Sequence, residues 1–225
     1  MNYFFEPTFV GNETEFQLSE SEFAHAKVLR LAIGDPISLL NGKGTIANCV
    51  ITEFTKKHLS VVVHKTETQK ITKELSLAVG ILDNKDRFEF LIEKATELGV
   101  RDFYPLKTAY SAKESRLNLT RLELKMISAL KQSGNPFVMN IHPPKTIEEL
   151  LSLEFDSIIA ADISGSLFAP QNDSINQLII IGPEGGLSQT ELQLLQLDSR
   201  VQLLQLPTNR LRAETAAIAV VSRCL

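Results

Sequence analysis

Residues 179–188 read IIIGPEGGLS and join a short apolar run directly to a glycine-rich turn. A continuous run of this kind is typical of a strand that is buried on both faces of a parallel sheet. Ser188 and Glu191 have the spacing of a capping box, so a helix should follow the turn. Ligands of open α/β sheets bind at the carboxyl ends of the strands, and glycines let a ligand approach the backbone closely. We therefore expect an α/β fold with a ligand loop at 182–186; a plain strand-to-helix turn is the alternative.

The rest of the chain after residue 74 shows the same alternation of strand and helix, which is typical of a largely parallel sheet. Apolar spacing predicts one helix over 85–98, with Gly99 as its stop signal. The other expected elements are strands at 75–81, 102–106, 158–161, 178–181 and 201–206, and helices at 119–132, 188–197 and 213–224.

Residues 1–70 differ from this pattern because they are rich in short strands. Asn41 and Gly42 lie between two apolar runs and suit the positive φ of a hairpin turn. Ser19 and Glu22 have capping-box spacing before a short helix. Strands around one helix suggest a small β-barrel, and the polar stretch 65–74 suggests a linker.

Composition excludes several classes of protein. The 225 residues are 44% hydrophobic and 22% charged, which is ordinary globular usage. The first residues lack the features of a signal peptide, and no apolar run is long enough for a transmembrane helix. The two cysteines are far apart, and Cys49 in a predicted strand suits a small core residue. We expect a disulfide-free cytoplasmic protein.

Familiar catalytic motifs are missing from the sequence. The glycine loop matches neither G-x-G-x-x-G nor the P-loop, and there is no G-x-S-x-G nucleophile elbow. The four histidines, at 25, 58, 64 and 142, have no metal-ligand spacing and suit structural or surface roles.

Charge is distributed unevenly along the chain. The net charge is −4, yet residues 101–131 carry +4 and residues 141–225 carry −5. The basic stretch suits either a nucleic-acid surface or a solvated helix face. Within the acidic part, Arg210 and Arg212 precede a helix, where their charge opposes the helix dipole. These arginines should therefore face an anion or a carboxylate.

The predicted helix 85–98 carries acidic residues four apart. Glu89, Glu93 and Glu97 form two repulsive pairs. The counter-charges must come from elsewhere, such as Lys85, Lys94 or a partner chain.

Together these segments resemble the ribosomal RNA small-subunit methyltransferase E family. The motifs that carry the resemblance are KDRFE at 85–89, EKATELG at 93–99, YPL at 104–106, KQS at 131–133, IGPEGG at 181–186 and RLRAETA at 210–216, with HAKVLRL at 25–31 and NGKG at 41–44. They run through nearly the whole chain. The sequence departs from the family pattern at Leu206-Pro207-Thr208, where Leu-Gly-Pro is usual, and at Ala213, where threonine is usual. Pro207 has no N–H to offer a ligand.

The resemblance implies an N-terminal PUA-like RNA-binding β-barrel over 1–70 and a C-terminal SPOUT α/β domain over 74–225 with a deep trefoil knot. It implies methylation of N3 of a uridine in 16S rRNA, with S-adenosylmethionine as donor and no metal. It also implies a homodimer that acts on the assembled 30S subunit. An RNA-binding module with a degenerate donor loop, or a SPOUT enzyme for another uridine, are the alternatives. A net charge of −4 predicts weak non-specific RNA affinity.

The resemblance also assigns site residues. Arg212 would stabilise negative charge on the uracil or anchor a phosphate, and Glu214 would orient Arg212. The residues expected to bind the donor are Leu203, Gly182, Glu184, Gly185, Gly186, Leu206, Leu211 and Thr215. The residues expected to bind RNA are Lys27, Arg30, Lys43, Lys85, Arg87, Lys113, Arg116 and Arg210.

Overall fold

The computed structural model describes residues 2–167, 175–207 and 209–225. The chain divides into two compact units. The first contains residues 1–71 and 127–138, and the second contains residues 72–126 and 139–225. The boundary falls within α3 (Leu119–Ser133), so the last turns of this helix belong to the first unit.

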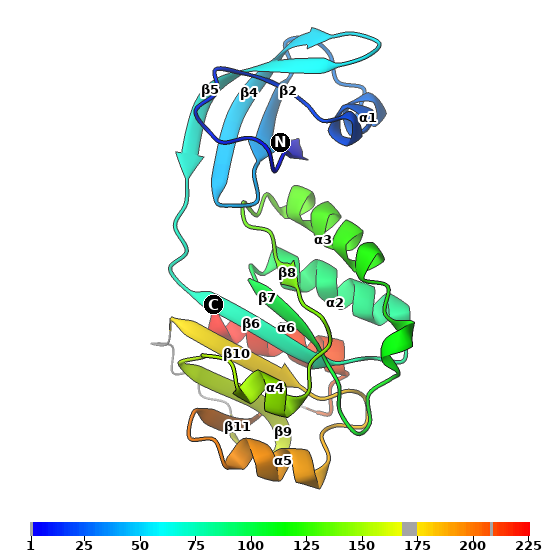
Figure 1. Cartoon of the computed structure of the whole chain (residues 1–225), viewed down its shortest axis with the longest axis vertical. Helices are drawn as coiled ribbons and strands as arrows, with labels where there is room; N and C mark the ends of the chain where they lie inside the picture. Colours follow the sequence, from blue (N-terminus) through cyan, green and yellow to red (C-terminus); the bar gives the residue numbers. More distant parts are fainter. Residues whose placement is uncertain (1, 168–174, 208) are drawn as a thin grey trace. The chain divides into compact units, whose positions relative to one another are not determined.

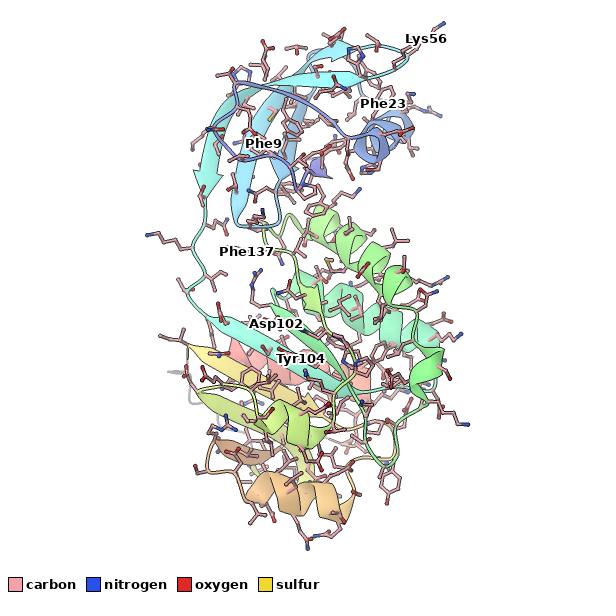
Figure 2. The ribbon with its side chains drawn as sticks, in the orientation of Figure 1. Phe9, Phe23, Lys56, Asp102, Tyr104 and Phe137 are labelled. Carbon is pink, nitrogen blue, oxygen red and sulfur yellow. The ribbon has the colours of Figure 1, made fainter. Side chains whose placement is uncertain are left out.

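The first unit contains a five-stranded sheet in the order β1-β3-β4-β5-β2. The strands are β1 (Tyr3–Phe5), β2 (Glu15–Gln17), β3 (Pro36–Leu40), β4 (Thr45–Phe54) and β5 (Leu59–Thr68). Phe9 and Phe23, labelled in Figure 2, pack in its core with Leu39, Ile51 and Val61. Figure 1 shows α1 (Glu20–Val28) beside these strands.

The expected hairpin is confirmed, and its turn shows why glycines are needed. β3 and β4 pair antiparallel, and Gly42 and Gly44 between them have φ of 76° and 102°. β5 continues further than expected: Lys65 to Thr68 pair with Thr45 to Asn48 instead of forming a linker. A polar composition did not exclude a strand here, because these residues lie on a largely exposed part of the strand that pairs with β4.

The capping box expected at Ser19 and Glu22 is wrong. The Ser19 side chain makes no capping hydrogen bond; its N–H donates to Glu6 Oε1 at 2.7 Å. Glu22 is instead buried, and Lys131 Nζ lies 2.8 Å from its Oε1. This carboxylate therefore serves a contact between α1 and the end of α3.

The second unit is a six-stranded sheet in the order β11-β9-β10-β6-β7-β8, with every neighbouring pair parallel. Its strands are β6 (Glu74–Gly80), β7 (Asp102–Leu106), β8 (Asn140–Ile141), β9 (Ser157–Leu167), β10 (Asn176–Ile181) and β11 (Val201–Gln205). Its helical elements are α2 (Lys85–Glu97), the 3-10 turn η1 (Glu114–Arg116), α4 (Ile147–Leu151), α5 (Gln189–Gln196) and α6 (Ala213–Cys224). The expected α/β class is thus confirmed.

Helices cover both faces of this sheet (Figure 1). α6 packs on β6 and β10 next to α2. Ile147 and Leu150 of α4 and Leu195 of α5 pack on the opposite face against residues such as Ile158 and Ile180. Double coverage explains why the central strands are continuous apolar runs.

The acidic face of α2 finds its counter-charges mostly in α3. Arg121 donates to both carboxylate oxygens of Glu89, and Lys125 Nζ lies 2.8 Å from Glu93 Oε1. Lys94 pairs with Glu97 in α2 itself, as the sequence suggested. Within the described residues, no helix is long and apolar enough to cross a membrane.

Candidate active site at the carboxyl ends of the strands

The carboxyl ends of β6, β10 and β11 lead into three loops, at 81–84, 182–188 and 206–212. The first two loops begin side by side, because β6 and β10 are neighbours in the sheet. A methyl group at Gly80 would lie 2.4 Å from Cδ of Pro183. Only glycine allows this approach, so the end of β6 fixes the start of the 182–188 loop.

The glycine-rich turn after β10 is compact. Gly186 has a φ of 77° and its N–H donates to the carbonyl of Pro183 at 2.9 Å. A methyl group at Gly182 would lie 2.8 Å from the carbonyl carbon of Gly186. The capping box at Ser188 and Glu191 is present and starts α5, as expected. The turn therefore exposes backbone at 184–186 in a fixed shape.

Charged side chains join the three loops. The guanidinium of Arg87, in the first turn of α2, lies 3.7 Å from Glu214 Oε1 and 3.9 Å from Glu184 Oε1. Arg210 Nη2 donates to the backbone carbonyl of Glu184 at 3.2 Å. These four residues come from segments that follow three different strands, and we call them the Arg–Glu cluster.

One carboxylate oxygen of the Arg–Glu cluster is unsatisfied. The side chain of Glu214 is 8% exposed, and its Oε2 is buried without a hydrogen-bond partner among the described residues. Buried polar atoms almost always have a partner in native proteins. An acceptor left open at the carboxyl edge of the sheet is suited to a donor group on a ligand.

The predicted site residues fall into distinct environments. Glu184, Arg210 and Glu214 are brought together with Arg87, which the sequence had assigned to RNA. Arg212 is exposed immediately before α6. No hydrogen bond or ion pair joins Arg212 to Glu214 in the part of the chain that the structure describes, whereas Arg87 does approach this carboxylate.

Four further predicted donor residues lie in β11, in the 206–212 loop and in α6. Leu203, Leu206 and Leu211 are half-buried, and Thr215 is exposed. Among the predicted RNA-binding residues, Lys27, Arg30, Lys43, Lys85 and Lys113 are exposed, while the side chain of Arg116 lies outside the described residues.

The basic stretch 101–131 is largely neutralised by contacts inside each unit. Arg121 and Lys125 pair with Glu89 and Glu93, and Lys131 pairs with Glu22. These three residues are therefore less suited to a nucleic-acid surface than the sequence suggested, because their charges are already paired.

The histidines and Cys49 have surroundings that suit structural roles. His142 stacks on Tyr104 with a ring separation of 4.3 Å, and its Nε2 lies 2.6 Å from Asp102 Oδ1 (Figure 2 labels Asp102 and Tyr104). No group of side chains suited to a metal ion occurs among residues 2–167, 175–207 and 209–225. Burial raises the pKa of the Cys49 thiol to about 12.

Sequence reasoning missed two features at the carboxyl edge of the sheet. One is the position of Arg87 between two carboxylates. The other is Tyr110, whose Cβ would lie 2.8 Å from a methyl group at Gly185.

A shallow hollow lies at the opposite edge of the sheet, beside the segment that precedes β11. It is lined by Leu151, Leu194 and Leu197.

The chain matches two domain models, and both are domains of RNA methyltransferases. Residues 53–225 match the model of the RNA methyltransferase domain, and residues 18–63 match that of the RNA methyltransferase PUA domain. The chain is 31% identical to ribosomal RNA small subunit methyltransferase E of Rickettsia conorii, over 95% of this chain and 91% of the relative. The protein of the same name from Mesomycoplasma hyopneumoniae is 32% identical, over 96% and 97%.

Solved structures share the fold. The enzyme of this name from Neisseria gonorrhoeae, bound to S-adenosyl methionine, superposes with a TM-score of 0.89 at 24% identity, over 99% of this chain and 96% of that one. A predicted RNA methyltransferase from Thermotoga maritima gives a TM-score of 0.73 at 29% identity, over 100% and 97%. From the matched domain models and these relatives, the chain belongs to the ribosomal RNA small subunit methyltransferase E family.

Proposed function

We propose that the protein transfers a methyl group from S-adenosylmethionine to N3 of a uridine in 16S rRNA. The observation that carries this proposal is the convergence of the 182–188 loop, the 206–212 loop and the start of α2 on the Arg–Glu cluster. Family membership supplies the reaction class, and the cluster supplies a site at the carboxyl edge where α/β folds bind ligands.

The residues at this edge fit the donor. The unsatisfied Oε2 of Glu214 can accept a hydrogen bond from a hydroxyl or amine of S-adenosylmethionine. The glycine turn can bring backbone N–H groups close to the same ligand. The half-buried side chains of Leu203, Leu206 and Leu211 offer apolar walls. We infer that Gly182, Glu184, Gly185, Gly186 and Thr215 complete this site. S-adenosylmethionine, when bound, supplies an electrophilic methyl group on a sulfonium.

The chain's own contribution is to hold the uracil and to stabilise its charge. Uracil N3 becomes a good nucleophile only after it loses its proton. The guanidinium of Arg212 can stabilise the negative charge that then spreads to the uracil oxygens. Glu214 is held by Arg87, so we assign Glu214 to donor binding and to positioning of the loops. Arg212 is exposed, and the N3 proton can leave to water at this rim.

The wider assignments rest on the family. We infer that residues 1–70 act as a PUA-like RNA-binding barrel through Lys27, Arg30 and Lys43. Residues 74–225 would form the SPOUT domain with its C-terminal trefoil knot, and Lys85, Lys113, Arg116 and Arg210 would meet RNA. We place the enzyme in the cytoplasm as a homodimer that acts on the assembled 30S subunit.

The test is methylation of small ribosomal subunits from a strain that lacks this gene, with isotopically labelled donor. Mass spectrometry of the nucleosides should show labelled 3-methyluridine, and primer extension should stop at one uridine of 16S rRNA. A stop elsewhere would support action on another RNA uridine. A calorimetric titration without donor binding at millimolar concentration, together with retained RNA binding, would support the degenerate RNA-binding module instead.

A further inference from the structure

The loop that follows β7, residues 107–113, is held firmly at the carboxyl edge of the sheet. At its two ends, Lys107 N–H donates to the carbonyl of Lys145 and Ala112 N–H donates to the carbonyl of Ile81, both at 2.8 Å. In its middle, Ala109 N–H donates to Glu191 Oε1 at 2.9 Å. The carboxylate of Glu191 also caps α5 through Ser188, so this loop is tied to the glycine turn.

The loop presents one aromatic side chain, Tyr110, to solvent. Tyr110 is 58% exposed although the backbone on both sides of it is fixed. Its base packs on the glycine turn: a methyl group at Gly185 would lie 2.8 Å from Tyr110 Cβ and 3.2 Å from Cγ. Gly185 does not have a positive φ, so backbone conformation does not require glycine there. The contact with Tyr110 does.

An exposed tyrosine on a fixed loop is suited to stacking. Aromatic side chains stack on unpaired RNA bases, and the loss of such a ring costs about 10- to 100-fold in affinity, since one stacked base contributes about 1–3 kcal/mol. Glu184, the neighbour of Gly185, accepts a hydrogen bond from exposed Arg210. A cation suited to an RNA phosphate therefore lies near the same turn.

We propose that Tyr110 is a stacking platform for a base of the RNA substrate, placed against the donor loop. This inference rests on the proposed function and adds a substrate-binding residue to it. Enzymes that modify a base must take it out of its stack, and an aromatic ring beside the site lowers the cost of doing so. The adenine of the donor is a poorer occupant, because the ring faces solvent and only its base is packed.

Two substitutions and a control test this proposal. Tyr110→Ala removes the ring, and Tyr110→Phe keeps it and removes only the hydroxyl. Phe90→Ala removes another exposed aromatic ring, 44% exposed on α2, and serves as the control. For each protein we would measure the Kd for a fluorescent oligouridine and for unmodified small ribosomal subunits, the KM for those subunits, and the Kd for S-adenosylmethionine.

Tyr110→Ala should raise the RNA Kd and KM by about 10- to 100-fold and leave the donor Kd within twofold. Tyr110→Phe and Phe90→Ala should stay within threefold of the wild type in every measurement. An unchanged RNA Kd in Tyr110→Ala would overturn the proposal, as would a weakening of donor binding alone, which would assign the ring to adenine. If the wild type binds RNA through Tyr110 but methylates no RNA, the proposed methyltransferase function is wrong, whereas the stacking role of Tyr110 is supported.

Discussion

Arg87 approaches the buried carboxylate of Glu214 from a different strand-to-helix segment, with Nε 3.7 Å from Oε1. The distance is longer than a tight hydrogen bond, and the second oxygen of Glu214 is unsatisfied. The pair therefore holds the start of α6 beside α2 while leaving capacity for a ligand.

Removal of either partner should destabilise the second unit. Arg87→Ala leaves a buried charge without its counter-ion, which costs about 1–3 kcal/mol of unfolding free energy. Glu214→Gln in the Arg87→Ala background should recover part of this loss, because the buried group is then neutral. Urea denaturation of the four proteins in a double-mutant cycle measures the coupling. Strict additivity of the two single changes would contradict a direct interaction.

Replacement of Arg212 should affect catalysis and spare the fold. Arg212 is exposed, so Arg212→Ala should keep the thermal midpoint, while kcat falls by about 100-fold or more through lost charge stabilisation. Lys56→Ala is a matched control: it removes one positive charge from the turn between β4 and β5, at the tip labelled in Figure 2. Turnover of Arg212→Ala near that of Lys56→Ala would remove Arg212 from the mechanism.

The buried pair in the first unit should be costly to break. Lys131→Met removes the ammonium from the 4% exposed Glu22 and leaves the ring of His25, with Nδ1 3.5 Å from Oε2, so the unfolding free energy should fall by about 3 kcal/mol. Glu22→Met combined with Lys131→Met should be more stable than Lys131→Met alone, since apolar replacements remove the uncompensated charge. Equal unfolding free energies of the single and double variants would show that Glu22 carries no buried, uncompensated charge in Lys131→Met.

Acid should weaken the contact between Asp198 and Arg200. Hydrogen bonds from Arg200 lower the pKa of the Asp198 carboxyl to about 2. The folded state then binds fewer protons than the unfolded state, so this stabilisation is present above about pH 4 and is lost as the pH falls toward 2. Asp198→Asn removes it. Denaturation midpoints of the two proteins should differ at pH 6, and the difference should shrink steadily below pH 4 and vanish only as the pH falls below about 2. A constant difference would contradict the pairing.

Cys49 should be unreactive in the folded protein. Burial raises the pKa of its thiol to about 12, so almost no thiolate forms at pH 8. A thiol reagent should modify Cys49 only after guanidinium is added, as peptide mass spectrometry would report. Rapid modification without denaturant would show that the first unit opens readily.

Local sequence patterns predicted local features well. The capping box of Ser188 and Glu191 and the span of α6 depend on residues three or four apart, and both agree with the structure. The partners of Glu89 and Glu22 could not be found in this way, because Arg121 and Lys131 are 32 and 109 residues away. The capping box predicted from Ser19 and Glu22 was wrong because Glu22 binds the distant Lys131 instead. The Arg–Glu cluster is likewise set by strand order.

The division of the first unit into residues 1–71 and 127–138 has a consequence for how the chain is made. During synthesis, β1 to β5 leave the ribosome well before the segment that supplies Lys131 to Glu22, Val138 beside Gly42 and Phe137 beside Gly44. Until then Glu22 lacks the ammonium of Lys131. The apolar residues of β1 to β5 therefore stay partly exposed while about 55 residues of the second unit are synthesised. A gene fragment that ends at residue 71 should accordingly yield an aggregation-prone product, and one that restores 127–138 through a short linker should not.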